Sequence, residues 1–271
     1  MTEVFVTNQM IDVAKEVALA SVDAICKYFR KNRDSHQDKN DKSAIVTAAD
    51  IEVEIKMRAI IEKQFSDHSI QGEELKDKVG MSEYKWVLDP IDGTSNFAMG
   101  KPIFGTLVAL VKGNKPILGI IYQPILNEMF MGIEGKGTFL NDKLIKTSPI
   151  TTLKNSLMAT NPPYMFETDA EKRVLWGLYN DVRSTEFGGD CYNYAMLADG
   201  HIDVTLISGD DFHDFAAVIP IVKGAGGVIT DWEGNELTPE SSGHILATAN
   251  RQLHEIALER ITRYRTEPRH I

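Results

Sequence analysis

Residues 86 to 96 read Trp-Val-Leu-Asp-Pro-Ile-Asp-Gly-Thr-Ser-Asn, and this stretch says most about fold and chemistry. An apolar run of strand type leads directly into two carboxylates, Asp89 and Asp92. Pro90 stiffens the turn between them, and Gly93 lets backbone N–H groups approach an anion. Carboxylate oxygens are the ligands that hard divalent cations prefer. We therefore predict a strand that ends in a turn able to bind a metal ion and a phosphate.

Composition and charge narrow the possible partners. The chain has 271 residues and a formal net charge of −10, so nucleic acid and anionic membrane surfaces are repelled on average. No apolar stretch is long enough to span a bilayer, and residues 1 to 10 lack a signal-peptide pattern. Cys26 and Cys191 fit no disulfide framework and are expected to be small core residues. We expect a cytoplasmic protein with a small-molecule partner, without nucleic-acid or membrane partners.

Hydrophobic periodicity predicts the order of helices and strands. Helical spacing indicates one helix over residues 10–30 and a second that starts at a capping box formed by Thr47 and Asp50. Glycine turns separate strand-like runs in the first half, whereas strands alternate with helices in the second. The expected strands cover residues 85–88, 104–110, 116–122, 128–133, 137–140, 155–160, 202–207 and 228–231, and the later helices cover residues 170–179, 192–198 and 215–222.

This order predicts an α/β (α+β) layered sandwich. We expect an N-terminal subdomain over residues 1–150 and a C-terminal subdomain over residues 151–271, with the site between them. The polar segment over residues 31–42 is predicted to be an exposed loop that closes over the site.

Two distant segments offer further carboxylates. Glu73 and Glu74 follow a strand-like Ser-Ile-Gln, and Asp214 stands ahead of an apolar helical run. Combined with Asp89 and Asp92, they would form a multi-metal centre, and oxygen donors without a Cys and His pattern favour Mg²⁺ over Zn²⁺. Each segment alone fits a solvated loop, a turn or a helix cap. The hypothesis therefore depends on their combination.

Two familiar aspartate motifs fail on single positions. An EF-hand loop beginning at Asp89 needs a glutamate at its twelfth position, which is Gly100. A haloacid-dehalogenase-type motif ending in Asp92-Gly93-Thr94 would place its nucleophilic aspartate at Pro90, which has no carboxylate.

The combined pattern resembles the inositol monophosphatase superfamily over nearly the whole chain. The segments that carry the resemblance are Gly72-Glu73-Glu74, Asp89-Pro90-Ile91-Asp92-Gly93-Thr94, Asp214-Phe215-Ala216-Ala217 and Gly224-Ala225-Gly226-Gly227. The resemblance implies a layered α/β sandwich, usually a homodimer, with Mg²⁺ as cofactor. It also implies in-line attack of an activated water on phosphorus, without a phosphoenzyme.

The same resemblance implies roles for individual residues. The implied metal ligands are Glu73, Asp89, Asp92, Asp214 and the main-chain carbonyl of Ile91. Thr94 would help Glu73 to activate the attacking water, with Asp50 in a supporting role. The amides of Gly93 and Thr94 would hold the phosphate.

Residues 188–194, Gly-Gly-Asp-Cys-Tyr-Asn-Tyr, look more like the histidinol-phosphatase branch than the Gly-Ser-Ala-Ala pattern of typical inositol phosphatases. This resemblance makes Asp190 a candidate substrate contact. Histidinol phosphate carries a cationic amine, which Asp190, Asp210 and Asp211 would select by charge unless they are ordinary loop carboxylates. One departure is Ile207, where many members of both branches carry a glutamate.

We therefore expect a Mg²⁺-dependent phosphomonoesterase that acts on a small phosphorylated metabolite. Histidinol phosphate is the favoured substrate and inositol 1-phosphate is the alternative. A different class also stays open, namely a catalytically silent protein that binds a phosphorylated ligand.

Overall fold

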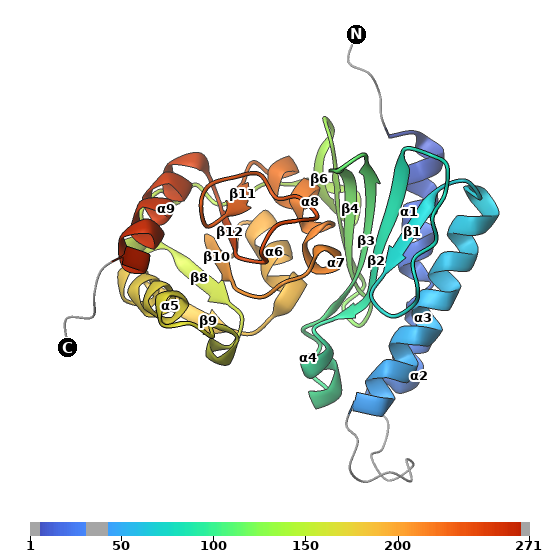
Figure 1. Cartoon of the computed structure of the whole chain (residues 1–271), viewed down its shortest axis with the longest axis horizontal. Coiled ribbons are helices and arrows are strands. Elements are labelled where there is room, and N and C mark those ends of the chain that lie inside the picture. The colour runs from blue at the N-terminus through green and yellow to red at the C-terminus, as the bar shows by residue number, and fades with distance from the viewer. Residues whose placement is uncertain (1–5, 31–42, 267–271) are drawn as a thin grey trace.

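The computed structural model describes residues 6–30 and 43–266, with the backbone alone for residues 43–47. Its elements form five layers in the order helix, sheet, helix, sheet, helix (Figure 1). The predicted α/β layered sandwich is confirmed. The predicted loop over residues 31–42 lies outside the described residues.

The first helical layer consists of α1 (Asn8–Leu19), α2 (Val22–Tyr28) and α3 (Ser43–Gln64). The prediction of one helix over residues 10–30 is wrong, because the chain leaves the helical path at Ala20 and Ser21. There the Ser21 hydroxyl and the Ser21 N–H both donate to the Ala18 carbonyl, over 2.8 Å and 3.3 Å. The capping box predicted at Thr47 is also wrong, since α3 begins at Ser43 and holds Asp50 in its interior.

The first sheet has seven strands in sequence order. They are β1 (Ser69–Gly72), β2 (Tyr84–Asp92), β3 (Gly105–Lys112), β4 (Lys115–Gln123), β5 (Glu128–Ile133), β6 (Gly137–Leu140) and β7 (Lys143–Ile145). All neighbours are antiparallel except β1 and β2, which run parallel with Gly72 opposite Leu88. The predicted hairpin at Gly113-Asn114 is confirmed. The parallel pair brings the residues after β1 beside the end of β2.

The second sheet has five strands in the order β11, β12, β10, β8, β9. Their bounds are β8 (Leu157–Thr160), β9 (Ser184–Phe187), β10 (Val204–Ile207), β11 (Val228–Asp231) and β12 (Ile245–Thr248). Strands β8, β9 and β10 are parallel, so their carboxyl ends share one edge of the sheet. That edge is where ligands bind in many open α/β sheets.

Helices cover both faces of the second sheet. Those between the two sheets are α6 (Asp190–Ala198), α7 (Phe212–Phe215) and α8 (Val218–Gly224), and those on the outer face are α5 (Asp169–Asp181) and α9 (Arg251–Thr266) (Figure 1). Short elements are α4 (Thr94–Met99) and the 3₁₀ turns η2 (Leu153–Asn155) and η3 (Pro163–Met165). The helix predicted over residues 215–222 is wrong as one element, because the chain divides it between α7 and α8.

Close packing joins the first sheet to the helices between the sheets. A Cβ on Gly119 would lie 1.9 Å from the Ala217 carbonyl oxygen, and one on Gly132 would lie 2.4 Å from the Ile221 nitrogen. Only glycine permits this approach, so α8 rests directly on β4 and β5. Trp86 and Trp232 are buried, whereas the expectation of a core position is confirmed for Cys191 but wrong for the exposed Cys26.

The change from the first sheet to the second falls between Ile145 and Leu157. Whether the halves divided at residue 150 are separate subdomains stays a prediction. Among the described residues, no helix is both long and apolar enough to cross a membrane.

Candidate active site

The end of β2 is held in place by its own polar atoms. The strand continues beyond the predicted residues 85–88 to Asp92, with its register against β3 shifting between Asp89 and Asp92. The Ile91 N–H donates to Asp89 Oδ1 over 3.0 Å, and the Thr106 hydroxyl donates to the Pro90 carbonyl over 2.8 Å. These bonds fix the Asp89 carboxylate and the backbone that leads to Asp92.

The chain then turns sharply into α4. Gly93 has φ +90°, a left-handed conformation that glycine adopts without a steric penalty. Thr94, the first residue of α4, is exposed, and its hydroxyl donates to the Ile91 carbonyl over 3.2 Å. A carbonyl oxygen has two lone pairs, so Ile91 can still accept another partner.

Three carboxylates converge at this turn. Asp89, Asp92 and Asp214 each present an oxygen, and these oxygens lie within 4.8 Å of one another. Bonds of about 2.1 Å to one Mg²⁺ would place its ligand oxygens about 3–4 Å apart, so small side-chain rotations would complete such a site. The donor set therefore fits a hard divalent cation.

Asp214 reaches the turn from α7. It was predicted to stand ahead of a helix, but it lies within α7, where a reciprocal cap holds it. The Asp211 N–H donates to Asp214 Oδ2 over 2.7 Å, while the Asp211 side chain accepts from the backbone in return. His213 Nε2 lies 3.4 Å from Asp214 Oδ1 and is half-buried. The Asp214 carboxylate thus caps the amino end of its own helix and also faces the β2 turn.

Glu73 reaches the same place because β1 and β2 are parallel. It follows Gly72, which pairs with Leu88, so Glu73 and Asp89 leave the sheet side by side. Its carboxylate is near enough to exchange a hydrogen bond with Asp89. Although Glu73 keeps an exposed surface, burial of its carboxylate raises its pKa. The structure therefore brings together all four predicted acidic ligands.

A buried glutamate missed by the sequence analysis supports Glu73. Glu54 on α3 accepts from the Glu74 N–H over 2.8 Å and from the Arg58 guanidinium over 2.7 Å. A Cβ on Gly72 would lie only 2.0 Å from Glu54 Oε1, so this glycine makes room for the carboxylate. The available signal was an acid and an arginine four residues apart on one helix.

Asp50 lies in the middle of α3 and is buried. Its Oδ1 atom has no hydrogen-bond partner among the described residues. Burial, followed by the charges of Glu73 and Glu74, raises the pKa of Asp50 to about 8. Asp50 therefore faces the Glu73 side of the site, and without a bound cation it is protonated at neutral pH.

Burial and neighbouring negative charges also raise the pKa values of Asp89 and Asp92. Burial raises the pKa of Asp89 well above its ordinary range, and the charges of Asp92, Glu73 and Asp214 add to this effect. Burial and the charges of Asp190 and Asp214 also raise the pKa of Asp92. A cation among these carboxylates would relieve both the repulsion and the desolvation.

Asp190 joins the turn from the start of α6. Its Oδ2 accepts from the Asn96 side-chain amide over 3.0 Å, and the Cys191 N–H donates to Asp92. A Cβ on Gly93 would lie 2.8 Å from Asp190 Oδ2. Asp190 is thus placed beside the predicted phosphate-binding residues, and Asn96 is a supporting residue that the sequence analysis did not predict.

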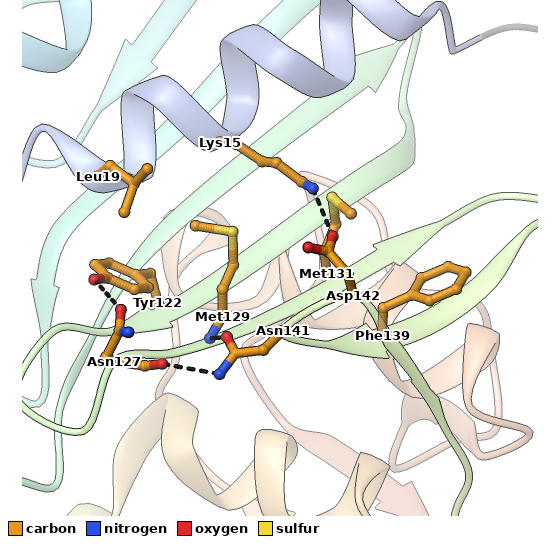
Figure 2. A pocket seen from close by; sticks show the side chains of 9 residues that line it. All are labelled: Lys15, Leu19, Tyr122, Asn127, Met129, Met131, Phe139, Asn141 and Asp142. Atoms are coloured by element: carbon orange, nitrogen blue, oxygen red, sulfur yellow. Dashed lines mark hydrogen bonds and ion pairs between the residues drawn. The ribbon is translucent and has the colours of Figure 1, made fainter.

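A pocket of about 230 Å³ lies elsewhere, between α1 and the first sheet (Figure 2). In Figure 2, Lys15 reaches across it to Asp142 at 2.7 Å, and Met129 and Met131 form part of its wall. No residue predicted for the site lines this pocket, so it is separate from the carboxylate cluster.

Comparison with known proteins identifies the family of the chain. The family model described as "Inositol monophosphatase family" matches residues 7–266. Bifunctional phosphatase IMPL2, chloroplastic, of Arabidopsis thaliana is 42% identical over 256 residues, which are 91% of this chain and 73% of the relative. A Histidinol-phosphatase of Chlorobaculum parvum is 30% identical over 244 residues, which are 90% of this chain and 93% of the relative.

The fold has equally clear relatives. The structure of an inositol monophosphatase from Zymomonas mobilis matches with a TM-score of 0.86 and 38% identity, covering 94% of this chain and 98% of the other. The resemblance seen in the sequence is therefore confirmed. The chain belongs to the inositol monophosphatase family and is a phosphatase of the kind that hydrolyses phosphoric monoesters.

Proposed function

We propose that this protein is a Mg²⁺-dependent phosphomonoesterase and that its substrate is histidinol phosphate. The observation that carries the proposal is the convergence of Asp89, Asp92 and Asp214 within 4.8 Å at the amino end of α4. A phosphate placed there would meet free backbone N–H groups as well as the bound cation.

The chain's own residues divide the work of binding and proton transfer. The proposed Mg²⁺ ligands are Glu73, Asp89, Asp92, Asp214 and the Ile91 carbonyl. When bound, Mg²⁺ supplies the positive charge that neutralises the phosphate and lowers the pKa of water. The amides of Gly93 and Thr94 hold the phosphate oxygens. Glu73 and the Thr94 hydroxyl orient the attacking water, the Glu73 carboxylate accepts its proton, and Asp50 supports Glu73.

The choice of substrate depends on the amine of histidinol phosphate. Asp190 lies beside Gly93, where it would meet a cationic group carried by a bound phosphate ester. The relative from Chlorobaculum parvum is named a histidinol phosphatase, which supports this choice. Inositol 1-phosphate is the second candidate, because other relatives are named inositol monophosphatases.

The test is phosphate release from histidinol phosphate and inositol 1-phosphate, with Mg²⁺ or with EDTA, for the wild type and for Asp92→Asn. We expect Mg²⁺-dependent release with a higher kcat/KM for histidinol phosphate, and loss of release in the variant. Preference for inositol 1-phosphate would overturn the substrate. Absence of Mg²⁺-dependent release from both esters would favour a catalytically silent protein that binds a phosphorylated ligand.

Two further properties belong to the same proposal. We expect a cytoplasmic homodimer that acts on a small metabolite, because the family resemblance implies dimers. Light scattering coupled to size exclusion would give the subunit count, and a monomeric mass at micromolar concentration would overturn the dimer.

A further inference from the structure

The segment after β1, residues 73–76, is held from one side by a residue of α3 that the proposed reaction does not use. This residue is Arg58. Its guanidinium donates from Nε to Glu54 Oε1 over 2.7 Å, from Nη2 to the Leu75 carbonyl over 3.0 Å and from Nη1 to the Lys76 carbonyl over 3.2 Å. Three donors of one planar group thus join a helix to a loop, a geometry that a guanidinium provides and an ammonium group does not.

The carboxylate that Arg58 binds holds both neighbours of Glu73. Glu54 accepts from the Glu74 N–H over 2.8 Å, and its Oε1 atom lies where a Cβ on Gly72 would be, at 2.0 Å. The next N–H along the chain, that of residue 75, also donates to Glu54 over 3.3 Å. Glu73 therefore lies between two residues whose backbone is fixed by one side chain.

The ion pair between Arg58 and Glu54 is buried. The Glu54 side chain is fully enclosed, and 11% of the Arg58 side chain is exposed. A buried ion pair loses its hydration, so it often adds little to the free energy of unfolding even when its geometry is good. This pair instead binds backbone groups of a second segment through both partners. That arrangement favours a role in fixing the conformation of residues 73–76.

A fixed position of Glu73 matters for metal binding. A side chain and a backbone that are ordered before a ligand arrives lose little further conformational entropy when it binds. Glu73 follows Gly72, which pairs with Leu88 in the sheet, so the ordered segment begins beside the end of β2. Without the contacts from α3, a bound cation would itself have to order residues 73–76. Part of its binding free energy would be used for that ordering.

We infer that Arg58, acting through Glu54, is a positioning residue that sets the affinity of the site for Mg²⁺. This inference rests on the proposed phosphatase function, in which Glu73 is a Mg²⁺ ligand. Arg58 acts through the Glu54 carboxylate and the backbone of residues 74–76, so that Glu73 is in place before the ion binds. Its loss should weaken Mg²⁺ binding more than it lowers turnover at saturating Mg²⁺, because the bound ion then holds Glu73 in the same position.

The experiment measures Mg²⁺ binding by calorimetry without substrate, and phosphate release across a Mg²⁺ series. The ester is histidinol phosphate or inositol 1-phosphate, whichever the wild type hydrolyses. Arg58→Lys keeps the positive charge but loses the planar fork, and Arg58→Met removes the charge. The matched control is Lys56→Met, which removes an equal charge two residues earlier on the same helix. Lys56 pairs with Glu52 at 3.0 Å, with 39% and 30% of the two side chains exposed.

Both Arg58 variants should weaken Mg²⁺ binding by about 10-fold, the effect of ordering one or two further residues. At saturating Mg²⁺ their kcat should stay within about 3-fold of the wild type, and Lys56→Met should change Mg²⁺ affinity by less than about 2-fold. A pure charge effect has a different signature, since loss of a positive charge would tighten Mg²⁺ binding in Arg58→Met and leave it unchanged in Arg58→Lys. Thermal melts would show whether Arg58→Met folds; if it does not, Arg58→Lys decides.

The outcomes separate this inference from the proposed function. A lower melting temperature with unchanged Mg²⁺ affinity in the Arg58 variants would show that the ion pair only stabilises the fold. Unchanged affinity in Arg58→Lys with tighter binding in Arg58→Met would show an effect of charge, and equal weakening in Lys56→Met would remove any specific role of Arg58. Each of these results overturns the inference while the Mg²⁺-dependent phosphatase stands. Absence of Mg²⁺ binding by the wild type would overturn the metal site and the inference together.

Discussion

The end of β2 and the carboxyl edge of the second sheet are both acidic, but they are built differently. At the end of β2, Asp89, Asp92 and Asp214 meet closely enough to surround one ion, and Glu73 is within hydrogen-bond reach of Asp89. At the sheet edge, Asp190 is the first residue of α6 and accepts from Asn96, whereas Asp210 lies in the loop after β10. Clustered oxygens suit a small metal ion, whereas a single carboxylate beside the phosphate-binding turn suits a cationic group on the substrate. Acidic charge alone therefore does not identify a ligand; the spacing does.

The largest expected effect belongs to the β2 end. Asp92→Asn should lower kcat for phosphate release by at least about 10²–10³-fold, because it removes a negative ligand from the cluster. Asn keeps an oxygen that can accept from the Cys191 N–H, so the fold should survive. Phosphate release and calorimetric Mg²⁺ binding measure the effect. Normal turnover with intact Mg²⁺ binding would remove Asp92 from the metal site.

Removal of the Glu54 carboxylate, which supports the segment that carries Glu73, should give the next largest effect. Glu54→Gln leaves the Arg58 guanidinium without its buried carboxylate and weakens the support of the Glu74 N–H. We expect the free energy of unfolding to fall by about 2–4 kcal/mol. Urea denaturation measures this change.

Glu52→Gln is the matched control on the same helix. Glu52 pairs with Lys27 and Lys56 at a more exposed position, so its loss should lower the free energy of unfolding far less than Glu54→Gln does. Equal destabilisation by the two substitutions would show that burial of Glu54 has no special weight.

A smaller effect is expected at the sheet edge. Asp190→Asn should lower kcat/KM for histidinol phosphate by about 10-fold relative to inositol 1-phosphate, because an amide attracts an ammonium group less than a carboxylate does. Side-by-side steady-state kinetics provide the ratio. If both esters lose activity equally, Asp190 acts on the β2 turn through Asn96 and does not select the substrate.

The smallest effect concerns pH. The pKa of Asp50 is raised to about 8 in the folded protein, well above its value in an unfolded chain. The folded state therefore holds this proton more tightly, and stability falls as pH rises from about 4 towards 8. In EDTA, Asp50→Asn should stabilise the protein at pH 8 by about 1–2 kcal/mol relative to its effect at pH 4.

Denaturation in EDTA at several pH values tests the Asp50 prediction. A wild type and an Asp50→Asn variant with the same pH dependence would show that Asp50 ionises normally. Saturating Mg²⁺ should reduce the difference, because a cation near Glu73 favours the charged carboxylate.

Local sequence was sufficient for several elements. The hairpin at Gly113-Asn114 and the bounds of β5, β6 and β11 follow from alternating apolar residues between glycine turns. Local patterns failed at two places. Helical spacing over residues 10–30 did not reveal the break between α1 and α2 at Ser21, and Thr47 lies inside α3, which begins at Ser43. Strands β9 and β12 were not predicted, since short strands are recognised mainly by their neighbours in the sheet, and helix α9 was also missed.

The sequence by itself determined the β2 turn, because Asp89, Pro90, Asp92 and Gly93 lie within one short stretch of chain whose geometry is set by local backbone constraints. It also indicated the family and the acidic residues involved. Only the tertiary structure decided which acids meet. The parallel pairing of β1 with β2 brings in Glu73, α7 brings in Asp214, and α3 provides Glu54 as support. These contacts join segments far apart in the chain, and long-range packing, which no local pattern encodes, forms them.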